Sequence, residues 1–413
     1  MILKSPQELL PHLFRQEYAK MTAVLCRHFG LQHIELAEDI ASDTFLKASE
    51  HWPVHGIPKH PVAWLYTVAK NKLKDYYKHL SVFEQKVKPA LLNSEQKAIP
   101  EQEWDHRYIE DSFLAMIFAV CNPVNTPESQ ICLALQILCG FSMEEIARAF
   151  LSKPETIKKR LQRARQYLRN DGFNIVALDR TAIQKRLNTV LKTLYLLYNE
   201  GYYSVTHDTQ IRAELCSEAM RLTLLLTENR LTNTPAANAL LALMCYQSSR
   251  LPARMNEHNE TILFEEQDVR LWDQSLIQRG HYYLIQATEG AEVSKYHLEA
   301  GIAYWHTTTD ASKWNRILQL YNQLVLLEYS PITVLNRLFA YSKVYGKKMA
   351  IEETERLESS ENNYYYALLG YLYTDIDNEK AIYHYERAIQ LSRSVVEKRT
   401  LQRQLVKLRD GNS

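Results

Sequence analysis

The sequence is poor in glycine and has no long apolar run. Only 11 of its 413 residues are glycine, while 46% are hydrophobic. This balance allows a sizeable core and favours helices over β-structure. No apolar stretch approaches the ~20 residues that a membrane-spanning helix needs. The first ten residues have no apolar segment behind a basic start, so they do not resemble a secretion signal. We therefore expect an all-α, cytoplasmic protein without a membrane partner.

Patterns of metal sites, disulfides and enzymes are also scarce. The six cysteines include no C-x-x-C pair, and we interpret them as buried thiols in a reducing compartment. A proline-rich stretch, predicted to be a loop at Trp52–Lys59, is associated with His51, His55 and His60, but no acidic or cysteine ligand joins them at metal spacing. No P-loop, G-x-S-x-G motif or carboxylate pair at a strand end is present. We expect no cofactor, no metal and no catalytic activity.

The overall charge does not identify a partner. The chain has 49 Lys+Arg and 48 Asp+Glu, a formal net charge of +1, so any affinity for nucleic acid must come from local patches. A chain of this length is expected to form two or three domains. The position of charges along the chain is therefore more informative than their sum.

The stretch 142–169 has the pattern of two helices around a tight turn. Ser142 with Glu145 and Ser152 with Glu155 form capping-box patterns, in which a hydroxyl and a carboxylate satisfy free N–H groups at a helix start. Four residues separate the two helical patterns. This spacing predicts a helix-turn-helix.

The second of these helices is divided into an apolar and a basic face. Its predicted packing stripe is Ile157, Leu161, Ala164 and Leu168. Between positions 154 and 169 the chain has six basic residues and one acidic residue, which favours contact with phosphates. In such units the start of the second helix reaches base edges in the major groove. The alternative is a solvated charged helix of an ordinary bundle.

Two earlier helices carry opposite charges. A helix predicted at 34–50 has an acidic face, which is either solvated or a docking surface for a basic partner. A helix predicted from Pro61 to Leu80 mixes lysines with tyrosines, which suits single-stranded or melted nucleic acid. An amphipathic core helix is the alternative for this second stretch. The sequence from Ser81 to about Trp104 loses periodicity, and we interpret it as a flexible linker.

The order of these parts resembles a known family. The segments AEDIASDTFLKASEHW, PVAWLYTVAKNKLKDYYK and TPESQICLALQILCGFSMEEIARAFLSKPETIKKRLQRARQYLR are similar to the extracytoplasmic-function (ECF) group of bacterial sigma-70 RNA polymerase sigma factors. The resemblance covers about the first 170 residues. It implies sigma domain 2 at 1–80, a linker at 81–106 and a helix-turn-helix domain 4 at 107–172.

The resemblance implies a role for each charged helix. The acidic helix would dock on the β′ clamp helices of the polymerase core, and domain 4 on the β flap. The core-binding residues would be Glu38, Asp39, Asp43 and Phe45. The residues that open and read the −10 promoter element would be Lys70, Asn71, Lys72, Lys74, Asp75, Tyr76 and Lys78. The residues that read the −35 element as duplex would be Glu155, Thr156, Lys158, Lys159, Arg160 and Arg163. Ser42 departs from the family, which usually has glutamine there, and this puts the strength of core binding in doubt.

The remainder of the chain, 173–413, is predicted to be one helix after another. The stretch YYYALLGYLYTDIDNEKAIYHYERAIQL places small and aromatic residues much as a tetratricopeptide repeat does. The whole chain resembles ECF sigma factors with a fused C-terminal tetratricopeptide-type domain. We hypothesise that this domain regulates the sigma domains in cis or receives a signalling protein. An irregular helical bundle is the alternative.

One polar cluster is predicted within the apolar C-terminal helices. Its members are Glu266, Gln267, Asp268, Arg270 and Trp272. They would bind a ligand or clamp the sigma domains if functional. As a purely structural feature they would form a buried polar network that fixes packing.

The leading alternative for the whole protein is a helix-turn-helix regulator with a repeat-type sensor domain. Such a protein would bind its operator without polymerase and would not act as a sigma factor. That alternative gives no role to the basic, tyrosine-rich helix at 61–80.

Overall fold

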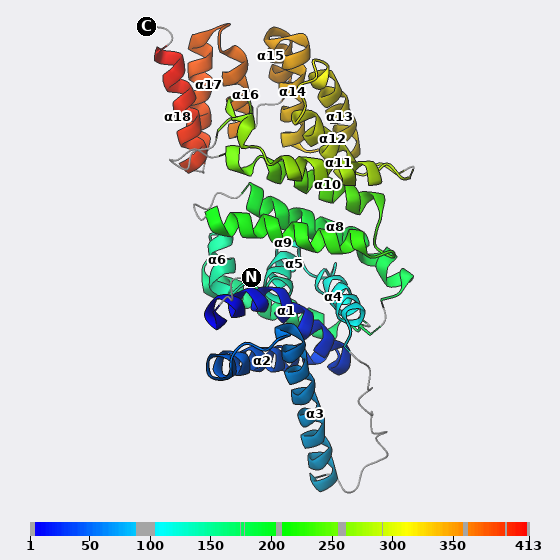
Figure 1. The fold of residues 1–413 in the computed structure, drawn as a ribbon. Helices are drawn as coiled ribbons and strands as arrows, with labels where there is room; N and C mark the ends of the chain where they lie inside the picture. Colours follow the sequence, from blue (N-terminus) through cyan, green and yellow to red (C-terminus); the bar gives the residue numbers. More distant parts are fainter. Residues whose placement is uncertain are drawn as a thin grey trace. The chain divides into compact units, whose positions relative to one another are not determined.

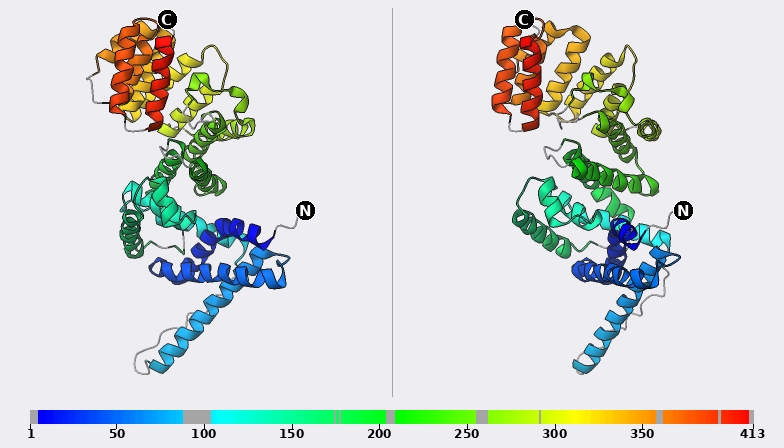
Figure 2. Two further views of the ribbon diagram at one scale, coloured as in Figure 1. Left: turned by 90° about the vertical axis from the view of Figure 1, so that its left-hand side faces the viewer. Right: turned by 60° about the vertical axis from the view of Figure 1, so that its left-hand side comes forward.

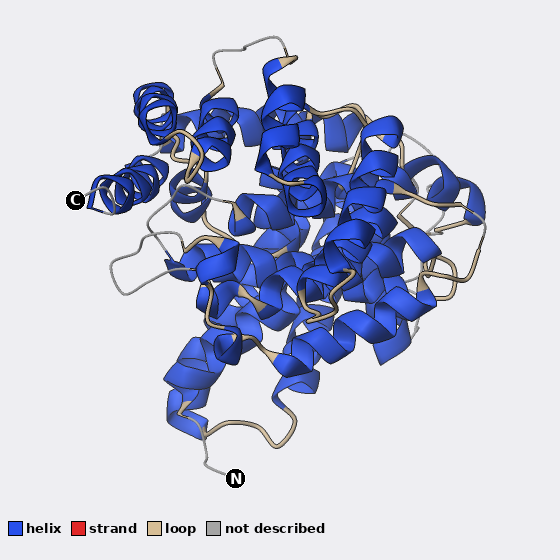
Figure 3. Ribbon diagram, turned by 90° about the horizontal axis from the view of Figure 1, so that it is seen from above, coloured by secondary structure: helices blue, strands red, loops and turns tan. Residues whose placement is uncertain are grey.

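The computed structural model describes residues 5–87, 104–173, 175–176, 178–203, 209–254, 262–290, 292–357, 362–392 and 395–410. Every regular element in these ranges is helical (Figure 3), which confirms the all-α prediction for them. None of the described helices has the length and apolar character needed to cross a membrane. The chain packs as two compact units, Met1–Leu196 and Leu197–Ser413.

The first unit begins with three long helices, α1 (Pro6–Phe29), α2 (Ile34–His55) and α3 (Pro61–Val87) (Figure 1). The capping box of α1 is formed by Ser5 and Glu8. α1 packs against α2, and α3 packs against both. The largest side chains enclosed by these helices are Met21, Leu25, Ile34, Trp52, Leu65 and Leu73.

The prediction of a loop at Trp52–Lys59 is wrong for its first half, because α2 continues to His55 despite Pro53. Trp52 is fully buried and packs edge-on against Trp64, with 5.6 Å between ring centroids. This tertiary contact outweighs the local cost of a proline inside a helix. The helix then ends at Gly56, whose φ of 83° suits glycine and whose N–H donates to the Trp52 carbonyl.

The prediction of a flexible linker at 81–106 is wrong at both ends that the structure describes. α3 runs on to Val87, since no glycine or proline occurs between Leu80 and Pro89 to stop it. At the other end, Trp104 donates a hydrogen bond of 3.1 Å to His28 Nε2 and is therefore anchored on α1. The middle of the predicted linker, 88–103, lies outside the described residues.

The two helices predicted on either side of a turn at 142–169 are present in the structure. α4 (His106–Val120) and α5 (Pro127–Leu133), which continues as a π-helical turn (Ala134–Leu138), precede α6 (Met143–Ala149) and α7 (Pro154–Asn170). The capping box of Ser142 and Glu145 is present at the start of α6.

The second predicted capping box is wrong. The residue that precedes α7 is Lys153, and its side chain makes no capping bond. Ser152 belongs to the preceding turn instead, where its N–H donates to the Ala147 carbonyl at 2.9 Å. Its hydroxyl is therefore one residue too early to cap α7.

α8 (Arg180–Tyr202) belongs to both units. In the first unit, Arg186 donates to Asp171 at 2.5 Å and to the Phe118 carbonyl at 3.1 Å. In the second unit, the hydroxyl of Tyr198 donates to the Met244 carbonyl at 3.1 Å. The first half of α8, although predicted to be part of the C-terminal domain, is thus bound to the helix-turn-helix region.

The second unit continues as a series of helical hairpins. Its helices after α8 are α9 (Thr209–Glu228), α10 (Pro235–Ser249), α11 (Gln274–Gln286), α12 (Lys295–His306), α13 (Lys313–Leu327), α14 (Pro331–Tyr345), α15 (Lys347–Glu355), α16 (Asn363–Tyr373), α17 (Asn378–Leu391) and α18 (Val395–Asp410). From α10 on they pack as pairs, α10 with α11 through α16 with α17, and α18 closes the series against α17 (Figure 2).

Close packing within a hairpin depends on glycine at two positions. A Cβ at Gly370 of α16 would lie 2.9 Å from ring carbons of Tyr385 in α17. A Cβ at Gly280 of α11 would lie 2.8 Å from the ring of Tyr246 in α10. Both rings are buried, so neither can move aside freely.

We predict that Gly370→Ala destabilises the protein by about 1–3 kcal/mol, because it overpacks the contact with Tyr385. The matched control is Gly301→Ala in α12, whose Cβ would meet the end of the flexible Leu320 side chain at 3.1 Å. Both changes gain similar helix propensity. Chemical denaturation should show a clear loss for Gly370→Ala and a smaller change for Gly301→Ala. Equal effects would show that the ring contact does not limit packing.

Candidate functional site

The acidic face of α2 is only partly open to solvent. Asp39 and Asp43 are exposed, whereas Glu38 is half-buried. Phe45 is 7% exposed, and its ring packs edge-on against Phe14 at 5.1 Å. Asp39 and Asp43 are thus the exposed acidic members of the predicted core-binding set, and Phe45 is buried.

The basic face of α3 lies next to this acidic face. Lys72 forms an ion pair of 3.0 Å with Asp43, which links the predicted −10 residues to the predicted core-binding residues. Lys70 and Tyr76 are half-buried, and the ring of Tyr76 packs edge-on against Phe29. The other predicted −10 residues are exposed, namely Asn71, Lys74, Asp75 and Lys78.

The basic face of α7 is largely open. The predicted packing stripe of Ile157, Leu161, Ala164 and Leu168 is buried, with at most 3% of any of these residues exposed. The exposed members of the predicted −35 set are Glu155, Thr156, Lys158, Lys159 and Arg163. Arg160 is half-buried, and its guanidinium approaches the Cys132 sulfur at 3.9 Å. All six cysteines are free and buried, as predicted.

An ion pair that the sequence did not predict connects α7 to α2. The guanidinium of Arg165 donates to both carboxylate oxygens of Glu38, at 2.7 and 2.8 Å, and to Gln136 at 3.0 and 3.1 Å. Side-chain exposure is only 14% for Arg165 and 18% for Glu38. One turn further along α7, Arg169 pairs with Glu35. Bidentate, charge-assisted bonds of this kind are among the strongest polar contacts in proteins.

This ion pair ties together two predicted binding surfaces. Burial disfavours the charge of Arg165, but the hydrogen bonds and charge of Glu38 raise the arginine pKa above its ordinary value. Glu38 is predicted to dock on polymerase. In this structure its carboxylate is bound by Arg165, a residue of the predicted −35 helix. The two residues are 127 positions apart, so no helical periodicity could have paired them. The only feature of the sequence that pointed to this ion pair was the presence of a strongly basic helix, α7, and an acidic helix, α2, in the same chain.

We predict that Arg165→Ala destabilises the protein by about 1–3 kcal/mol, because it leaves Glu38 half-buried without its partner. Arg163→Ala, two positions earlier and exposed, is the matched control and should change stability by less than about 0.5 kcal/mol. Denaturant melts would test this. A double-mutant cycle with Glu38→Gln should show strong coupling, and additive effects would contradict the importance of the pair.

The predicted C-terminal polar cluster does not form one cluster. Its residues lie on and between two short 3₁₀ turns, η4 (Phe264–Glu266) and η5 (Val269–Leu271), and not within helices as predicted. Asp268 starts η5 by accepting from the Arg270 N–H at 3.0 Å, and its carboxylate also binds the Arg270 side chain. This local pairing favours a turn over a helix.

The remaining members of the predicted cluster face different neighbours. Glu266 binds Arg403 and Lys407 of α18, at 2.9 and 2.6 Å. Trp272 is buried, with its ring centroid 6.2 Å from that of Phe264. Gln267 donates to the Ile262 carbonyl at 3.4 Å. The sequence did not indicate Arg403, Lys407 and the other residues that receive this segment, because they come from helices far along the chain.

One histidine beside this segment is held neutral. The ring of His306 packs edge-on against Phe264 at 4.5 Å. Burial, followed by the charges of Arg250 and Lys313, lowers the pKa of His306 to about 3. Because the folded pKa lies below the ordinary histidine value, the unfolded chain binds more protons below pH 6.5. His306 therefore stabilises the fold above pH 6.5, and this contribution is lost as the pH falls toward 3.

We predict that the free energy of unfolding falls by about 1 kcal/mol between pH 7 and pH 5.5 through His306 alone. His306→Gln should remove that part of the pH dependence. His12→Gln, at an exposed position of α1, is the control and should leave the dependence as it is in the wild type. Urea melts at several pH values measure both. An identical pH profile for wild type and His306→Gln would contradict the assignment.

Comparison with known proteins finds two regions of the chain that match family models. Residues 13–81 match the family model described as sigma-70 region 2. Residues 186–288 match a family of unknown function (DUF6596). The uncharacterized protein R00370 of Rhizobium meliloti (strain 1021) is 31% identical over 390 residues, which cover 92% of this chain and 91% of that protein. The chain belongs to the same family as R00370. No solved structure matches it.

The sigma-70 region 2 includes both charged helices of the N-terminal part. It extends from within α1, through α2, to Ser81 in α3. A region of this kind implies binding to RNA polymerase core and recognition of the −10 promoter element, in a non-enzymatic role in transcription initiation. The DUF6596 region begins within α8 and runs past the end of α11, and it includes η4 and η5. Helices α6 and α7, the predicted helix-turn-helix, lie between the two matched regions.

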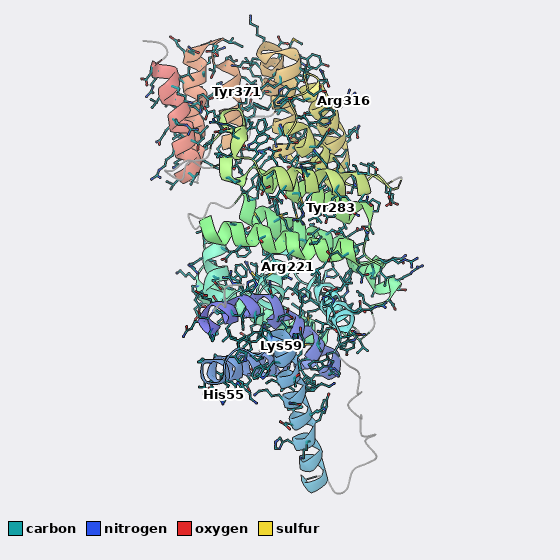
Figure 4. The ribbon with its side chains drawn as sticks, viewed as in Figure 1. His55, Lys59, Arg221, Tyr283, Arg316 and Tyr371 are labelled. Atoms are coloured by element: carbon teal, nitrogen blue, oxygen red, sulfur yellow. The ribbon has the colours of Figure 1, made fainter. Side chains whose placement is uncertain are left out.

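In the described part of the chain, no group of three or more histidine, cysteine, aspartate or glutamate side chains is placed to hold a metal ion. His51 and His55 stack on each other at the end of α2, with 4.1 Å between ring centroids. Figure 4 marks His55 and, four residues later, Lys59 in the segment that joins α2 to α3.

Proposed function

We propose that the protein is an ECF-type sigma factor with two DNA-reading helices and a regulatory C-terminal unit. It binds RNA polymerase core through the acidic face of α2 and directs initiation at specific promoters. The observation that carries this proposal is the sigma-70 region 2 match at 13–81. That match includes both the acidic helix and the neighbouring basic helix, which a simple operator-binding regulator does not require.

α3 is the proposed reader of the −10 element. Lys74 and Lys78 are exposed and one helical turn apart, so both can follow one strand of the DNA backbone. Tyr76 and Tyr77 are half-buried and pack edge-on against each other, with ring centroids 6.0 Å apart. Unpaired bases can stack on tyrosine rings, and the neighbouring exposed lysines can neutralise the phosphates.

α7 is the proposed reader of the −35 element. It is the second helix of a helix-turn-helix and is buried along one stripe only. Its N-terminal turns expose Glu155 and Thr156 for base contacts, and Lys158, Lys159 and Arg163 for bases or phosphates. Reading two elements through one polymerase complex raises the effective concentration of the second contact, so that each contact can be weak alone.

The second unit is the proposed regulator. A series of stacked helical hairpins exposes a large surface that other proteins can bind. We propose that it controls the sigma function, either in cis or on binding a protein partner.

We predict that full-length protein with purified core polymerase produces specific transcripts from the host's own promoter fragments. Lys74→Ala/Lys78→Ala and Lys159→Ala/Arg163→Ala should each reduce them by about 10-fold or more, since each removes exposed cations from a DNA-reading helix. Lys185→Ala/Lys192→Ala removes two exposed lysines of α8 and is the matched control.

The alternative function gives a different result in the same assay. A helix-turn-helix regulator would bind promoter fragments without polymerase and would yield no transcript with core alone. Transcripts that survive both double substitutions would contradict the assignment of the DNA-reading helices.

A further inference from the structure

The short segment Phe264–Glu266 is held by the helices of the second unit as a bound peptide would be. Phe264 is the apolar anchor. The guanidinium of Arg250, at the end of α10, lies 4.7 Å from its ring centroid. His306, the last residue of α12, packs edge-on against the same ring at 4.5 Å. The first helices of two successive hairpins thus enclose one aromatic side chain.

Glu265 faces the next two hairpins. Its carboxylate forms an ion pair with Lys343 of α14. Lys343 also donates to the hydroxyl of Tyr371 on α16 at 2.6 Å, and its ammonium lies 5.2 Å from the ring centroids of Phe339 and Tyr371. Tyr371 is marked in Figure 4. The aromatic rings and the Tyr371 hydroxyl hold the ammonium of Lys343 in place to meet the carboxylate of Glu265.

Glu266 faces α18, the last helix. Arg403 and Lys407, one turn apart, donate to its carboxylate at 2.9 and 2.6 Å, and Gln404 donates at 3.4 Å. Burial alone would raise the pKa of Glu266, but the hydrogen bonds from Lys407 and Gln404 and the charges of Lys407 and Arg403 lower it below its ordinary value. The carboxylate is therefore bound in its charged form.

Contacts to this three-residue segment come from α10, α12, α14 and α18, and through Tyr371 from α16. We call the six residues that make them the receiving face: Arg250, His306, Lys343, Tyr371, Arg403 and Lys407. These helices are the first members of the successive hairpins and the closing helix. A surface built from corresponding helices of stacked hairpins can hold an extended chain along its length.

The segment is attached mainly through its side chains. The N–H groups of Glu266 and Gln267 bond locally, to the carbonyls of Leu263 and Phe264 at 2.9 and 3.3 Å. Another chain with the same side chains could therefore replace it without breaking a helix or a sheet.

The segment also leaves polar atoms beside the receiving face unsatisfied. Among the described residues, four buried atoms next to it have no hydrogen-bond partner: Arg250 Nε, Gln267 Oε1, Trp272 Nε1 and His306 Nδ1. Buried polar atoms are nearly always paired in native proteins. The side chains around this segment therefore keep polar atoms that a different occupant could bond.

We propose that the receiving face is a binding site for a short peptide segment of a partner protein, in which an aromatic residue is followed by two acidic residues. The chain's own Phe264–Glu266 occupies the site in cis until that partner displaces it. The inference rests on the proposed protein-binding role of the second unit and names the chemistry of the partner. We choose a peptide over a nucleic acid because the occupant in this structure is a peptide segment with two carboxylates bound in the site.

The test uses a fluorescent synthetic peptide, LFEEQD, and full-length protein in an anisotropy titration. Wild type should bind it weakly, because the attached segment competes at high effective concentration. Glu265→Gln/Glu266→Gln weakens that competitor without changing its size and should bind the peptide at least about 10-fold more tightly. Glu266→Gln alone is a milder variant and should give a smaller gain in the same direction.

Control variants and control ligands test whether the binding is specific. Adding Arg403→Ala/Lys407→Ala to the opened variant should abolish the gain, whereas Lys398→Ala/Arg399→Ala on the same helix should not. The peptide LAQQQD should bind no variant tightly. A single-stranded oligonucleotide should not compete.

The proposal is overturned if both glutamine variants keep the wild-type circular dichroism and melting temperature but bind the peptide no better than wild type does. The segment would then be only a structural strap. Tight binding of LAQQQD, or of the oligonucleotide in place of the peptide, would overturn it as well. The assay contains no polymerase, so its failure would leave the proposed sigma function standing, and a failed transcription assay would leave this result standing.

Discussion

The bidentate contact of Arg165 with Glu38 is the interaction on which the first unit depends. It places the basic helix of the helix-turn-helix against the acidic helix of the sigma-70 region 2, and Gln136 completes the arrangement. An ion pair that is half removed from water is costly to break on one side only. The contact therefore holds a conformation in which part of the proposed polymerase-binding face is occupied. Under the proposed function, polymerase competes with Arg165 for Glu38, and assembly of the initiating complex is coupled to opening of the first unit.

The second unit also has charged side chains that are bound by other residues of the same chain. Glu265 and Glu266 bind cations of α14 and α18, and Phe264 is enclosed by Arg250 and His306. In the first unit a cation occupies a carboxylate of a proposed binding surface, whereas in the second unit two carboxylates occupy the cations of one. α8 belongs to both units, with Arg186 bound to Asp171 at one end and Tyr198 bound to Met244 at the other. A truncation after Gly172 would remove Arg186 from the first unit, so the role of the second unit is better tested in the full chain.

Local patterns predicted much of the fold. The described part of the chain after residue 173 is one helix after another, as predicted, and the packing stripe of α7 is buried as its spacing indicated. Failures occurred where distant contacts outweighed local propensity. Trp52 holds α2 in helix past Pro53, and Asp268 with Arg270 forms a turn where a helix was predicted. The pairs that define both binding surfaces join residues 127 and 137 positions apart. Periodicity along one element carries no information about such pairs.

The most direct measurement of the central claim is the affinity of the full-length protein for purified RNA polymerase core, compared between wild type and Arg165→Ala. The account predicts saturable binding by both proteins, and tighter binding by Arg165→Ala because Glu38 is released from its partner. Asp39→Ala/Asp43→Ala, which removes two exposed charges of α2, should weaken binding by about 10-fold or more. If neither wild type nor Arg165→Ala binds core while both remain folded, the protein is not a sigma factor and the account is wrong.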